Sequence, residues 1–247
     1  MLTTEEMERY QRQILVIGKE GQELLKQKKV LQIGLGGLGS PLSLYLVSSG
    51  IGELIIFEND ILSLSNLGRQ IIYKTEDVNK SKGDLAKSFL TKLNPNTRIT
   101  LIKERFSEKN ATQYLKNAQI DYLVDASDNF ETKFLINDLG LKFNIPFTIA
   151  GIQGFDGQII SVDPHKTACY RCVFGTMPKT DKLKQIPVMS PICGVVGSLE
   201  ANEVLKSLLK RGKRIINNLL MISLDSSDFT QIQIRINPSC ICQQQKK

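Results

Sequence analysis

Four glycines lie within six residues of the segment LQIGLGGLGS, which spans residues 31–40. Three of them form a G-x-G-x-x-G pattern between an apolar run and a stretch with helical periodicity: Gly34, Gly36 and Gly39, with Gly37 between them. Glycine permits a positive φ and leaves room for a ligand beside the backbone. The free N–H groups at the start of the following helix favour a phosphate. The segment therefore predicts a nucleotide-binding loop.

Polar side chains gather at the end of the second predicted strand and just beyond it. Glu58 follows the glycines by roughly 20 residues, where an acid can hold a ribose hydroxyl. The segment ENDILSLSNLGRQ adds Asp60, Asn66, Arg69 and Gln70, and Lys82 stands at the head of the next predicted helix. Arg69 can hold phosphate oxygens through its planar guanidinium, and Lys82 can add a point charge. A dehydrogenase does not need these groups, so they favour a triphosphate.

An acidic residue also follows the fourth predicted strand. Asp128 lies in the segment DASDN, with Asn129 beside it. Ligands of open α/β sheets bind at the carboxyl ends of the strands, where this carboxylate is expected. Carboxylates of this kind hold Mg²⁺ beside phosphates. Asp128 is therefore predicted to bind magnesium, and capping of the helix that begins near Asn129 is a compatible second role.

The chain has five cysteines, and four of them form two close pairs. The pairs are Cys169 with Cys172 and Cys240 with Cys242. Cytosolic proteins rarely keep structural disulfides, so a metal is a better first expectation than oxidation. The fifth, Cys193, follows Pro191 at the start of a predicted helix and is expected to be a small buried thiol.

The elements that must carry these residues alternate along the chain. Short strands are predicted at 29–34, 53–60, 98–104, 121–127 and 145–151, and helices at 40–50, 82–93, 110–117 and 129–144. This alternation favours a parallel sheet with right-handed crossovers and helices on both faces. Beyond residue 151 we expect an Asp-Gly turn at 156–157, a long helix at 190–210, and antiparallel strands at 218–225 and 230–236. The predicted class is α/β, Rossmann-like and mostly parallel, with antiparallel strands added at the C-terminal end.

Two helices are predicted before the first strand, within residues 1–28. Thr3 and Glu6 fit a capping box for the first, and the second is expected at 19–28. With 247 residues, ordinary globular composition and no internal repeat, the chain is expected to form one domain over residues 1–247.

Charge and hydropathy indicate the cellular location of the protein and the partners it favours. No apolar stretch is long enough to span a membrane, and the first residues are acidic and polar, which points to the cytoplasm. The formal net charge is +7. Because the lysines are spread along the chain without a long basic block, the charge favours a basic surface over specific nucleic-acid binding.

Six motifs of the chain resemble the ThiF/MoeB/HesA family, relatives of the ubiquitin-activating enzymes. They are RYQRQI, GLGGLGS, SLSNLGRQ, DASDN, CYRC and NPSC, in the family's order and nearly end to end along the chain. The resemblance implies ATP-dependent adenylation of the C-terminal glycine of a small ubiquitin-like sulfur-carrier protein. The products would be an acyl-adenylate and pyrophosphate, in the synthesis of molybdopterin, thiamine or a related thio-cofactor.

The resemblance assigns a role to each polar residue of the nucleotide site. Gly36 would lie against the nucleotide, and Glu58 would bind ribose. The phosphates would be held by Asp60, Asn66, Arg69 and Lys82, and Asp128 would bind Mg²⁺. The remaining residues expected around the nucleotide are Gly34, Gly37, Gly39, Gln70 and Asn129.

The resemblance also implies an assembly. In such homodimers the arginine of RYQRQI reaches into the neighbouring subunit's site, so Arg12 would act in trans beside the catalytic Arg69, Lys82 and Asp128 of that subunit. Residues 29–151 would be the nucleotide-binding half, and residues 152–247 the half that binds the carrier and zinc. No rhodanese-like extension follows Lys247, so the sulfur donor is expected to be a separate protein.

Family members hold structural Zn²⁺ with four cysteine thiolates in a closed tetrahedral site. The chain departs from the family at the second pair, where NPSCIC is one residue shorter than the usual C-x-x-C. Zinc bound by Cys169, Cys172, Cys240 and Cys242 is the expectation. A three-ligand or lost site and a redox pair are the alternatives.

Some relatives carry a cysteine for thioester or persulfide chemistry in the loop at 176–190. That loop has no cysteine here, and Leu183 stands near the position concerned. Adenylation without a covalent thioester is therefore expected. The only histidine, His165, lies beside Pro164 and is expected to be a surface residue.

Other functions fit part of these residues. The same site could adenylate the carboxylate of a peptide or of a modified tRNA nucleoside. An NAD-dependent oxidoreductase would use the glycines and Glu58 alone and leave Arg69, Lys82, Asp128 and the cysteines unused. A non-catalytic binding scaffold held together by zinc is the third possibility.

Overall fold

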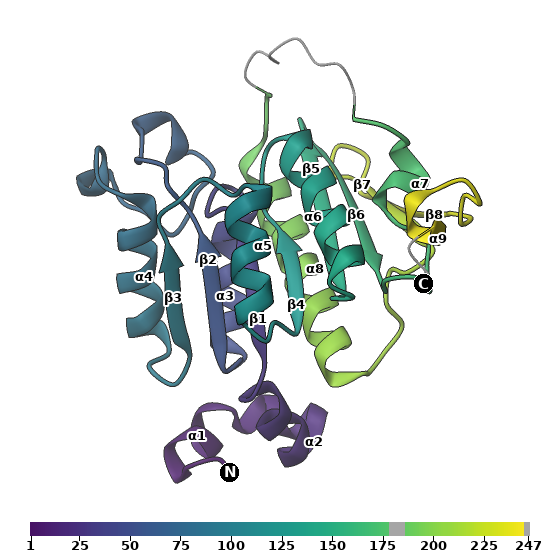
Figure 1. The fold of residues 1–247 in the computed structure, drawn as a ribbon. Helices are drawn as coiled ribbons and strands as arrows, with labels where there is room; N and C mark the ends of the chain where they lie inside the picture. The colour runs from purple at the N-terminus through teal and green to yellow at the C-terminus, as the bar shows by residue number, and fades with distance from the viewer. Residues whose placement is uncertain (178–185, 245–247) are drawn as a thin grey trace.

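A computed structural model describes residues 1–177 and 186–244 of the chain. One sheet forms its centre, built from β1 (Lys29–Ile33), β2 (Glu53–Phe57), β3 (Arg98–Ile102), β4 (Tyr122–Asp125), β5 (Phe147–Gln153), β6 (Asp156–Val162), β7 (Asn218–Ser223) and β8 (Asp228–Gln233). The strands lie in the order β3-β2-β1-β4-β5-β6-β7-β8 (Figure 1). The polypeptide therefore adds its last three strands to one edge of the sheet.

The direction of the strands divides the sheet in two. Strands β1 to β5 pair in parallel, whereas β5 to β8 pair antiparallel. The parallel order 3-2-1-4-5 reverses its sense between β1 and β4, and ligands of such sheets bind at this reversal, outside the carboxyl ends of the strands. The predicted Rossmann-like class, with antiparallel strands at the C-terminal end, is confirmed.

Helices cover both faces of the sheet (Figure 1). One face packs against α3 (Gly39–Ser48), α4 (Lys82–Leu93) and α8 (Ser190–Leu209), and the other against α5 (Glu108–Asn117) and α6 (Phe130–Lys142). Alternate residues of β1 serve the two cores: Val30 belongs to the first and Leu31 to the second, and both are fully buried. Each such side chain contributes roughly 1.5–3 kcal/mol through burial, so the sheet rigidly fixes the loops at its carboxyl edge.

The amino-terminal helices lie beyond the amino ends of the parallel strands (Figure 1). The first, α1 (Thr4–Arg9), begins with the predicted capping box of Thr3 and Glu6. The expected second helix at 19–28 is confirmed from residue 19 to Leu25, where α2 (Gln11–Leu25) ends. Gly18, with φ 76°, kinks α2, and the helical segment before that glycine lay outside the range predicted for the second helix.

The turn between β5 and β6 also differs from the prediction. The Asp-Gly dipeptide at 156–157 lies inside β6, and Gln153 pairs with Asp156 across the turn. The two turn residues are therefore Gly154 and Phe155, and Gly154 provides the positive φ of 59°. Two short helices, α7 (Tyr170–Phe174) and α9 (Ile241–Gln244), carry cysteines. Among the described residues, no helix is long and apolar enough to cross a membrane.

Candidate nucleotide and metal sites

The glycine loop joins β1 to α3 at the point where the strand order reverses. Gly34 has φ 96°, and a Cβ there would lie 2.8 Å from the Ala126 carbonyl oxygen. A Cβ on Gly39 would lie 2.3 Å from the Gly34 carbonyl oxygen. Both positions require glycine, because a side chain at either would strike backbone atoms. The loop therefore packs against the end of β4 and leaves the N–H groups at the start of α3 for a ligand.

Two side chains that sequence reasoning missed brace this loop. The Gln32 amide donates to the carbonyl oxygens of Gly34 and Gly39, at 2.9 and 3.1 Å. The Tyr73 hydroxyl donates to the Leu35 carbonyl oxygen at 3.2 Å. Gln32 is the one polar residue in the apolar run VLQI, and that exception was a usable signal.

Glu58 lies one residue beyond β2, 8% exposed, against the same loop. Its carboxylate accepts hydrogen bonds from the backbone N–H groups of Leu35 and Asp60, both at 2.8 Å. These bonds fix the carboxylate at the carboxyl edge and leave further lone pairs for a ribose hydroxyl. The structure thus places Glu58 where the spacing predicted it.

A buried lysine stands beside an exposed aspartate at the same edge. Lys82 is 5% exposed and forms an ion pair with Asp60, with 3.0 Å between Nζ and Oδ2. The Asp60 side chain is 63% exposed, so this ion pair lies at the surface end of the buried lysine side chain. An ammonium held in a fixed place is suited to binding a phosphate. The Asp60 carbonyl oxygen also accepts a hydrogen bond from the Lys82 N–H at 3.0 Å, which joins the two segments.

The segment after β2 turns through a short 3-10 helix at Leu64–Asn66. Asn66 accepts from the Ser63 N–H at 3.1 Å, and its carbonyl oxygen accepts from the N–H groups of Arg69 and Gln70. Asn66 therefore shapes the turn that presents the next two side chains. The Arg69 guanidinium bonds only the Ser65 carbonyl oxygen among the described residues, which leaves most of its donors available.

Gln70 is buried, at 3% exposed, and its Oε1 has no hydrogen-bond partner among the described residues. Its Nε2 lies 3.6 Å from the position of a Cβ on Gly36. An unpaired buried amide oxygen costs about 1–3 kcal/mol. A ligand hydroxyl or amine seated on the glycine loop would remove that cost, so the cradle fits a nucleotide.

Asp128 lies three residues beyond β4 and is exposed. It makes a weak contact of 3.5 Å with the Asn129 amide. The alternative role of Asp128 as a helix cap was wrong, because Asn129 Oδ1 accepts from the Thr132 N–H at 2.9 Å and caps α6. The Asp128 carboxylate is therefore free of helix capping and available to a cation.

The residue that ends β4 was missed by the sequence reading. Asp125 is fully buried and pairs with Lys133 of α6, at 2.6 Å between Oδ2 and Nζ. Asp125 also accepts from the Ser127 N–H and hydroxyl, at 3.0 and 2.6 Å. This buried pair joins the end of β4 to α6 and holds the segment that carries Asp128. The motif DASDN contained two acids, and only the second was considered.

Behind the sheet, α8 buries Glu200 completely. Neither of its carboxylate oxygens has a partner among the described residues. Burial raises the pKa of this carboxyl well above its usual range; the charge of Asp125 adds to the effect and Lys133 opposes it. Burial therefore favours the protonated form of Glu200 in the folded protein.

Cys193 is 1% exposed in the first turn of α8, as expected for a small buried thiol. Its position against the glycine loop was not expected: a Cβ on Gly37 would lie 2.7 Å from its sulfur. Burial raises the pKa of this thiol, with Arg69 opposing. Leu183 and most of the loop at 176–190 lie outside the described residues.

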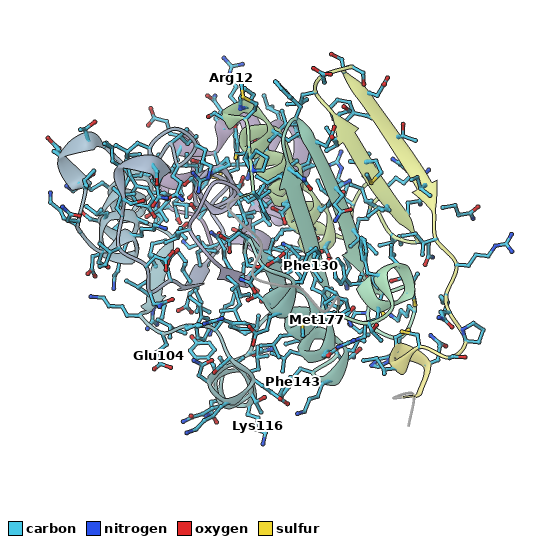
Figure 2. All side chains as sticks on the ribbon, turned by 90° about the horizontal axis from the view of Figure 1, so that it is seen from above. Arg12, Glu104, Lys116, Phe130, Phe143 and Met177 are labelled. Carbon is cyan, nitrogen blue, oxygen red and sulfur yellow. The ribbon has the colours of Figure 1, made fainter. Side chains whose placement is uncertain are left out.

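Arg12 lies on α2 and is exposed. In Figure 2 it lies at the rim of the molecule, apart from Phe130 at the start of α6. Because α2 lies at the amino ends of the strands (Figure 1), the structure does not bring Arg12 to the glycine loop of its own chain.

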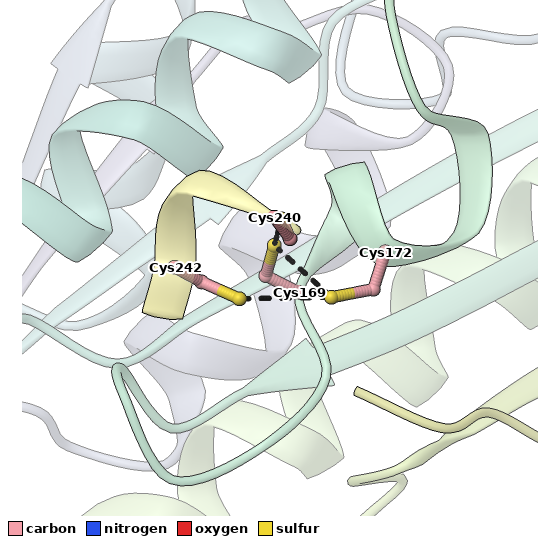
Figure 3. Close-up of side chains that lie close together, drawn as sticks. All are labelled: Cys169, Cys172, Cys240 and Cys242. Atoms are coloured by element: carbon pink, nitrogen blue, oxygen red, sulfur yellow. Dashed lines mark hydrogen bonds between the residues drawn. The ribbon is translucent and has the colours of Figure 1, made fainter. Parts of the chain in front are cut away.

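Four cysteines meet at the edge of the molecule, as their spacing predicted (Figure 3). All four sulfurs lie within 4.8 Å of one another. The contacts Cys169–Cys172, Cys169–Cys240 and Cys172–Cys242 measure 3.8, 3.5 and 3.6 Å. Sulfurs bound at 2.3 Å to one tetrahedral zinc are ~3.8 Å apart, so the donor set and its geometry fit that ion.

Without a metal, two thiols of the cluster resist ionisation. Burial raises the pKa of the Cys169 thiol far above its ordinary value, and that of Cys242 to about 11. The pKa of Cys172 is lowered: burial opposes the change, while the Asn237 N–H donates to its sulfur at 3.5 Å. A bound cation would offset the repulsion between neighbouring thiolates and so favour their ionised form.

The lone His165 is not the free surface side chain that was expected. It is half-buried, and its backbone has φ 60°. Its Nδ1 lies 3.2 Å from the Cys242 carbonyl oxygen and its Nε2 3.0 Å from the Leu141 carbonyl oxygen. The ring thus lies between the cysteine cluster and the end of α6.

Comparison with known proteins identifies the class that this fold and site define. The pattern of the ThiF family matches residues 10–243, so the chain belongs to the ThiF family. It is 39% identical to a sulfur carrier protein adenylyltransferase of Thermus thermophilus over 96% of this chain and 91% of that protein. It is 35% identical to the sulfur carrier protein ThiS adenylyltransferase of Escherichia coli, over 94% of this chain and 93% of that protein.

Solved structures share the fold. The crystal structure of E. coli MccB with ATP superposes with a TM-score of 0.83 at 26% identity, and covers 95% of this chain and 73% of that one. This similarity extends over both the parallel and the antiparallel strands.

Proposed function

We propose that this protein is an ATP-dependent adenylyltransferase that activates the C-terminal glycine of a small ubiquitin-like sulfur-carrier protein. Two relatives named for that activity match nearly the whole chain. The single structural observation that carries the proposal is the joint position of the glycine loop, Glu58, Lys82 and Arg69 at one carboxyl edge. A dinucleotide-dependent oxidoreductase would have no role for Lys82 and Arg69. A non-catalytic scaffold would need neither these two residues nor Glu58 and the glycine loop.

Each residue of that edge has a place in the proposed site. Gly34, Gly36, Gly37 and Gly39 form the floor on which the nucleotide lies, and Glu58 accepts the ribose hydroxyls. Asp60, Asn66, Arg69 and Lys82 hold the phosphates, with the buried Gln70 amide beside the glycine loop and the exposed Asn129 at the rim. The largely unpaired donors of Arg69 and the buried ammonium of Lys82 support this assignment, since the Lys82 charge is held in place by Asp60 before the ligand arrives.

A magnesium ion is proposed at Asp128, with the triphosphate supplying other ligands. Bound there, the ion would neutralise charge that builds on the departing pyrophosphate. The exposed position of the Asp128 carboxylate, free of the capping role that Asn129 fills, supports the assignment.

The reaction requires alignment more than side-chain chemistry. The carrier's terminal carboxylate attacks the α-phosphorus, the bond between the α-phosphorus and the α,β-bridging oxygen breaks, and pyrophosphate leaves with the electron pair. Positioning of the two reactants can supply about 7–11 kcal/mol of the barrier. Cys193 is buried behind the glycine loop, which supports adenylation without a covalent thioester at that thiol.

A homodimer is proposed to complete the site, with Arg12 acting on the partner's phosphates. Next to Arg12 on α2, Leu15 and Val16 are 78% and 62% exposed. A hollow of about 280 Å³ between α2 and α8 adjoins them, lined in part by Val16 and Leu209. Exposed apolar side chains beside an apolar hollow favour a second copy of this chain as the cover.

A structural zinc ion is proposed at Cys169, Cys172, Cys240 and Cys242, where it would join α7 to α9. The sulfur–sulfur contacts support four-coordinate binding despite the shortened second pair. A closed set of four sulfurs stabilises the fold and takes no part in adenylation. The sulfur that later reaches the carrier is proposed to come from a separate donor protein.

Exchange of labelled pyrophosphate into ATP tests the proposal. We expect exchange with a small ubiquitin-like carrier that ends in Gly-Gly, and none with the same carrier lacking its last glycine. Asp128→Ala is expected to abolish exchange and to leave the folded dimer intact by gel filtration. Undiminished exchange in that variant would remove Asp128 from the mechanism, and exchange driven by a short peptide alone would instead favour a peptide substrate.

A further inference from the structure

The two cysteine pairs are attached to the rest of the protein in different ways. In the first pair, Cys169 immediately precedes α7 and Cys172 lies within it, and the neighbouring residues bind α6 directly. The Tyr170 N–H donates to Asn137 Oδ1 at 2.9 Å, and the Arg171 guanidinium makes two bonds of 2.7 Å to the Asp138 carboxylate. The first pair is therefore held by side chains of one helix.

The second pair has fewer such attachments. Its backbone turns locally, with bonds from Cys240 N–H to the Asn237 carbonyl and from Gln243 N–H to the Cys240 carbonyl, at 3.0 and 2.9 Å. Apart from the sulfur contacts within the cluster, the hydrogen bond of the described residues that ties residues 240–242 to the body of the protein is the contact of His165 with the Cys242 carbonyl oxygen. The ring is therefore the main polar anchor of this segment.

The spacing of the pairs explains why an outside anchor matters. In the C-x-x-C pair, the Cys172 N–H donates to the Cys169 carbonyl oxygen at 2.9 Å, and this turn directs both sulfurs to one side. In the C-x-C pair, no bond between Cys240 and Cys242 is found among the described residues. The backbone of the shorter pair must be oriented from outside if both sulfurs are to face the first pair.

His165 connects that backbone to the same helix that holds the first pair. Its Nε2 lies 3.0 Å from the Leu141 carbonyl oxygen. Leu141 follows Asn137 by four residues, so the two positions share one face of α6. Carbonyl oxygens only accept hydrogen bonds, so the neutral ring donates to one of the two according to its tautomer, and a doubly protonated ring donates to both. One face of α6 thus serves as the common support of both pairs.

The loop that carries the ring is itself fixed. His165 adopts φ 60°, which a residue with a side chain adopts only with strain. The Thr167 hydroxyl and the Asp163 backbone bond each other in both directions, at 3.0 and 3.2 Å, and Arg214 pairs with Asp163. A strained residue held in a braced turn, with its ring between two carbonyl groups, indicates a specific positioning role.

We propose that His165 is a positioning residue of the four-cysteine metal centre, where it holds the shortened Cys240–Cys242 pair against α6 so that its sulfurs complete the tetrahedron. The inference rests on the zinc centre proposed above. It assigns a task to the one histidine of the chain, which the adenylation reaction does not use.

Zinc affinity tests this role directly. His165→Asn and His165→Gly both suit the left-handed backbone, so the first removes the bridge without new strain and the second covers a failure of the first to fold. The matched control is Lys87→Gly, an exposed position inside α4 where glycine weakens the helix at the far end of the sheet. The readouts are competition for zinc by a chelating dye, the absorption spectrum of the cobalt-loaded protein, and thermal unfolding.

We expect both His165 variants to lose zinc to the dye about 10–100 times more readily than the parent, while Lys87→Gly unfolds earlier but keeps the parent's affinity. Affinity in both His165 variants within about twofold of the parent would overturn the positioning role. The parent protein is measured first with zinc and with cobalt. If the parent binds neither ion, both the proposed zinc centre and the role of His165 are contradicted. If the parent and the variants bind equally well, only the role of His165 is contradicted.

Discussion

The sulfur of Cys193 lies directly behind Gly37, where a Cβ on the glycine would approach it to 2.7 Å. The Arg69 side chain lies on the same glycine, with its Cγ 3.6 Å from that Cβ position. The first turn of α8 therefore packs beneath the glycine loop. Gly37 lies between that turn and the Arg69 side chain, whose guanidinium is expected to hold phosphate.

We predict that Gly37→Ala weakens ATP binding, because the new methyl group pushes the loop away from Cys193 and into the nucleotide space. Overpacking of this kind costs about 1–3 kcal/mol, or roughly 5–150-fold in affinity. Adding Cys193→Ala should restore most of the loss by removing the sulfur. Isothermal titration with MgATP measures both variants.

The control for this pair is Gly194→Ala, one residue beyond Cys193, where a Cβ would meet nothing within 4 Å. It should bind ATP like the parent. Equal affinity in Gly37→Ala and the parent, or no recovery in the double variant, would contradict the described packing.

A second prediction concerns Arg12. Co-expression of Arg12→Ala with Asp128→Ala should regain activity if Arg12 serves the partner's site, although each variant alone is inactive. Random pairing gives mixed dimers in half of the population, each with one intact site of two, or about a quarter of parental activity. If Arg12 acted within its own chain, every subunit of the mixed dimers would carry one defect, and carrier-dependent exchange would stay at background.

Zinc binding should weaken as the pH falls. Burial raises the pKa of the Cys169 thiol far above its ordinary value, and it raises the pKa of Cys242 to about 11, so the metal-free cluster holds protons that zinc must displace. Each displaced proton changes the apparent affinity up to about tenfold per pH unit between roughly pH 6 and pH 8. Competition by a chelating dye across that range measures the slope. Cys193→Ser, which lies outside the cluster, should leave it unchanged; an affinity independent of pH would argue that the thiols are already ionised.

The buried Glu200 should limit stability at neutral pH. Burial raises the pKa of its carboxyl in the folded state, so the folded protein keeps a proton that the unfolded chain releases above about pH 4.5. The stability that the neutral carboxyl provides is complete below that pH and declines as pH rises through the folded pKa. Glu200→Gln should therefore stabilise the protein at pH 7, by up to about 1.4 kcal/mol for each pH unit above the unfolded pKa.

Urea unfolding at about pH 4.5 and pH 7 separates the outcomes, because the gain should vanish at the lower pH. Asp121→Asn, a partly exposed acid that pairs with Lys28, is the comparison. It should lose stability at neutral pH instead of gaining it. A Glu200→Gln protein no more stable than the parent at pH 7 would show that the carboxyl is ionised in the folded protein and that its charge is stabilised there.

Much of the fold follows from the alternation of apolar runs and helical stretches. The strands and most helices lie near their expected ranges because burial on both faces makes β1, β2 and β4 mainly apolar. The errors occur where local signals are ambiguous. The helical pattern before Gly18 is short, and the Asp-Gly pair at 156–157 entered a strand because Gly154 already supplied the turn.

The candidate site shows the same division. Glycine spacing and the polar run after β2 indicated Glu58, Arg69 and Lys82, because those residues stand at fixed distances from strand ends. The supporting contacts of Gln32 and Asp125 were missed, although their partners Gly39 and Lys133 follow them closely along the chain. No local pattern places His165 against Leu141, because that contact exists only after the sheet and α6 have formed.

The most direct test of adenylation is the mass of the carrier itself. The enzyme in excess is mixed with MgATP and a ubiquitin-like carrier ending in Gly-Gly, quenched in acid, and the intact carrier is weighed by mass spectrometry. We predict the gain of one adenylyl group, dependent on ATP and on the carrier's last glycine, and absent with Asp128→Ala. A carrier whose mass stays unchanged while the enzyme demonstrably binds MgATP would contradict the proposed reaction.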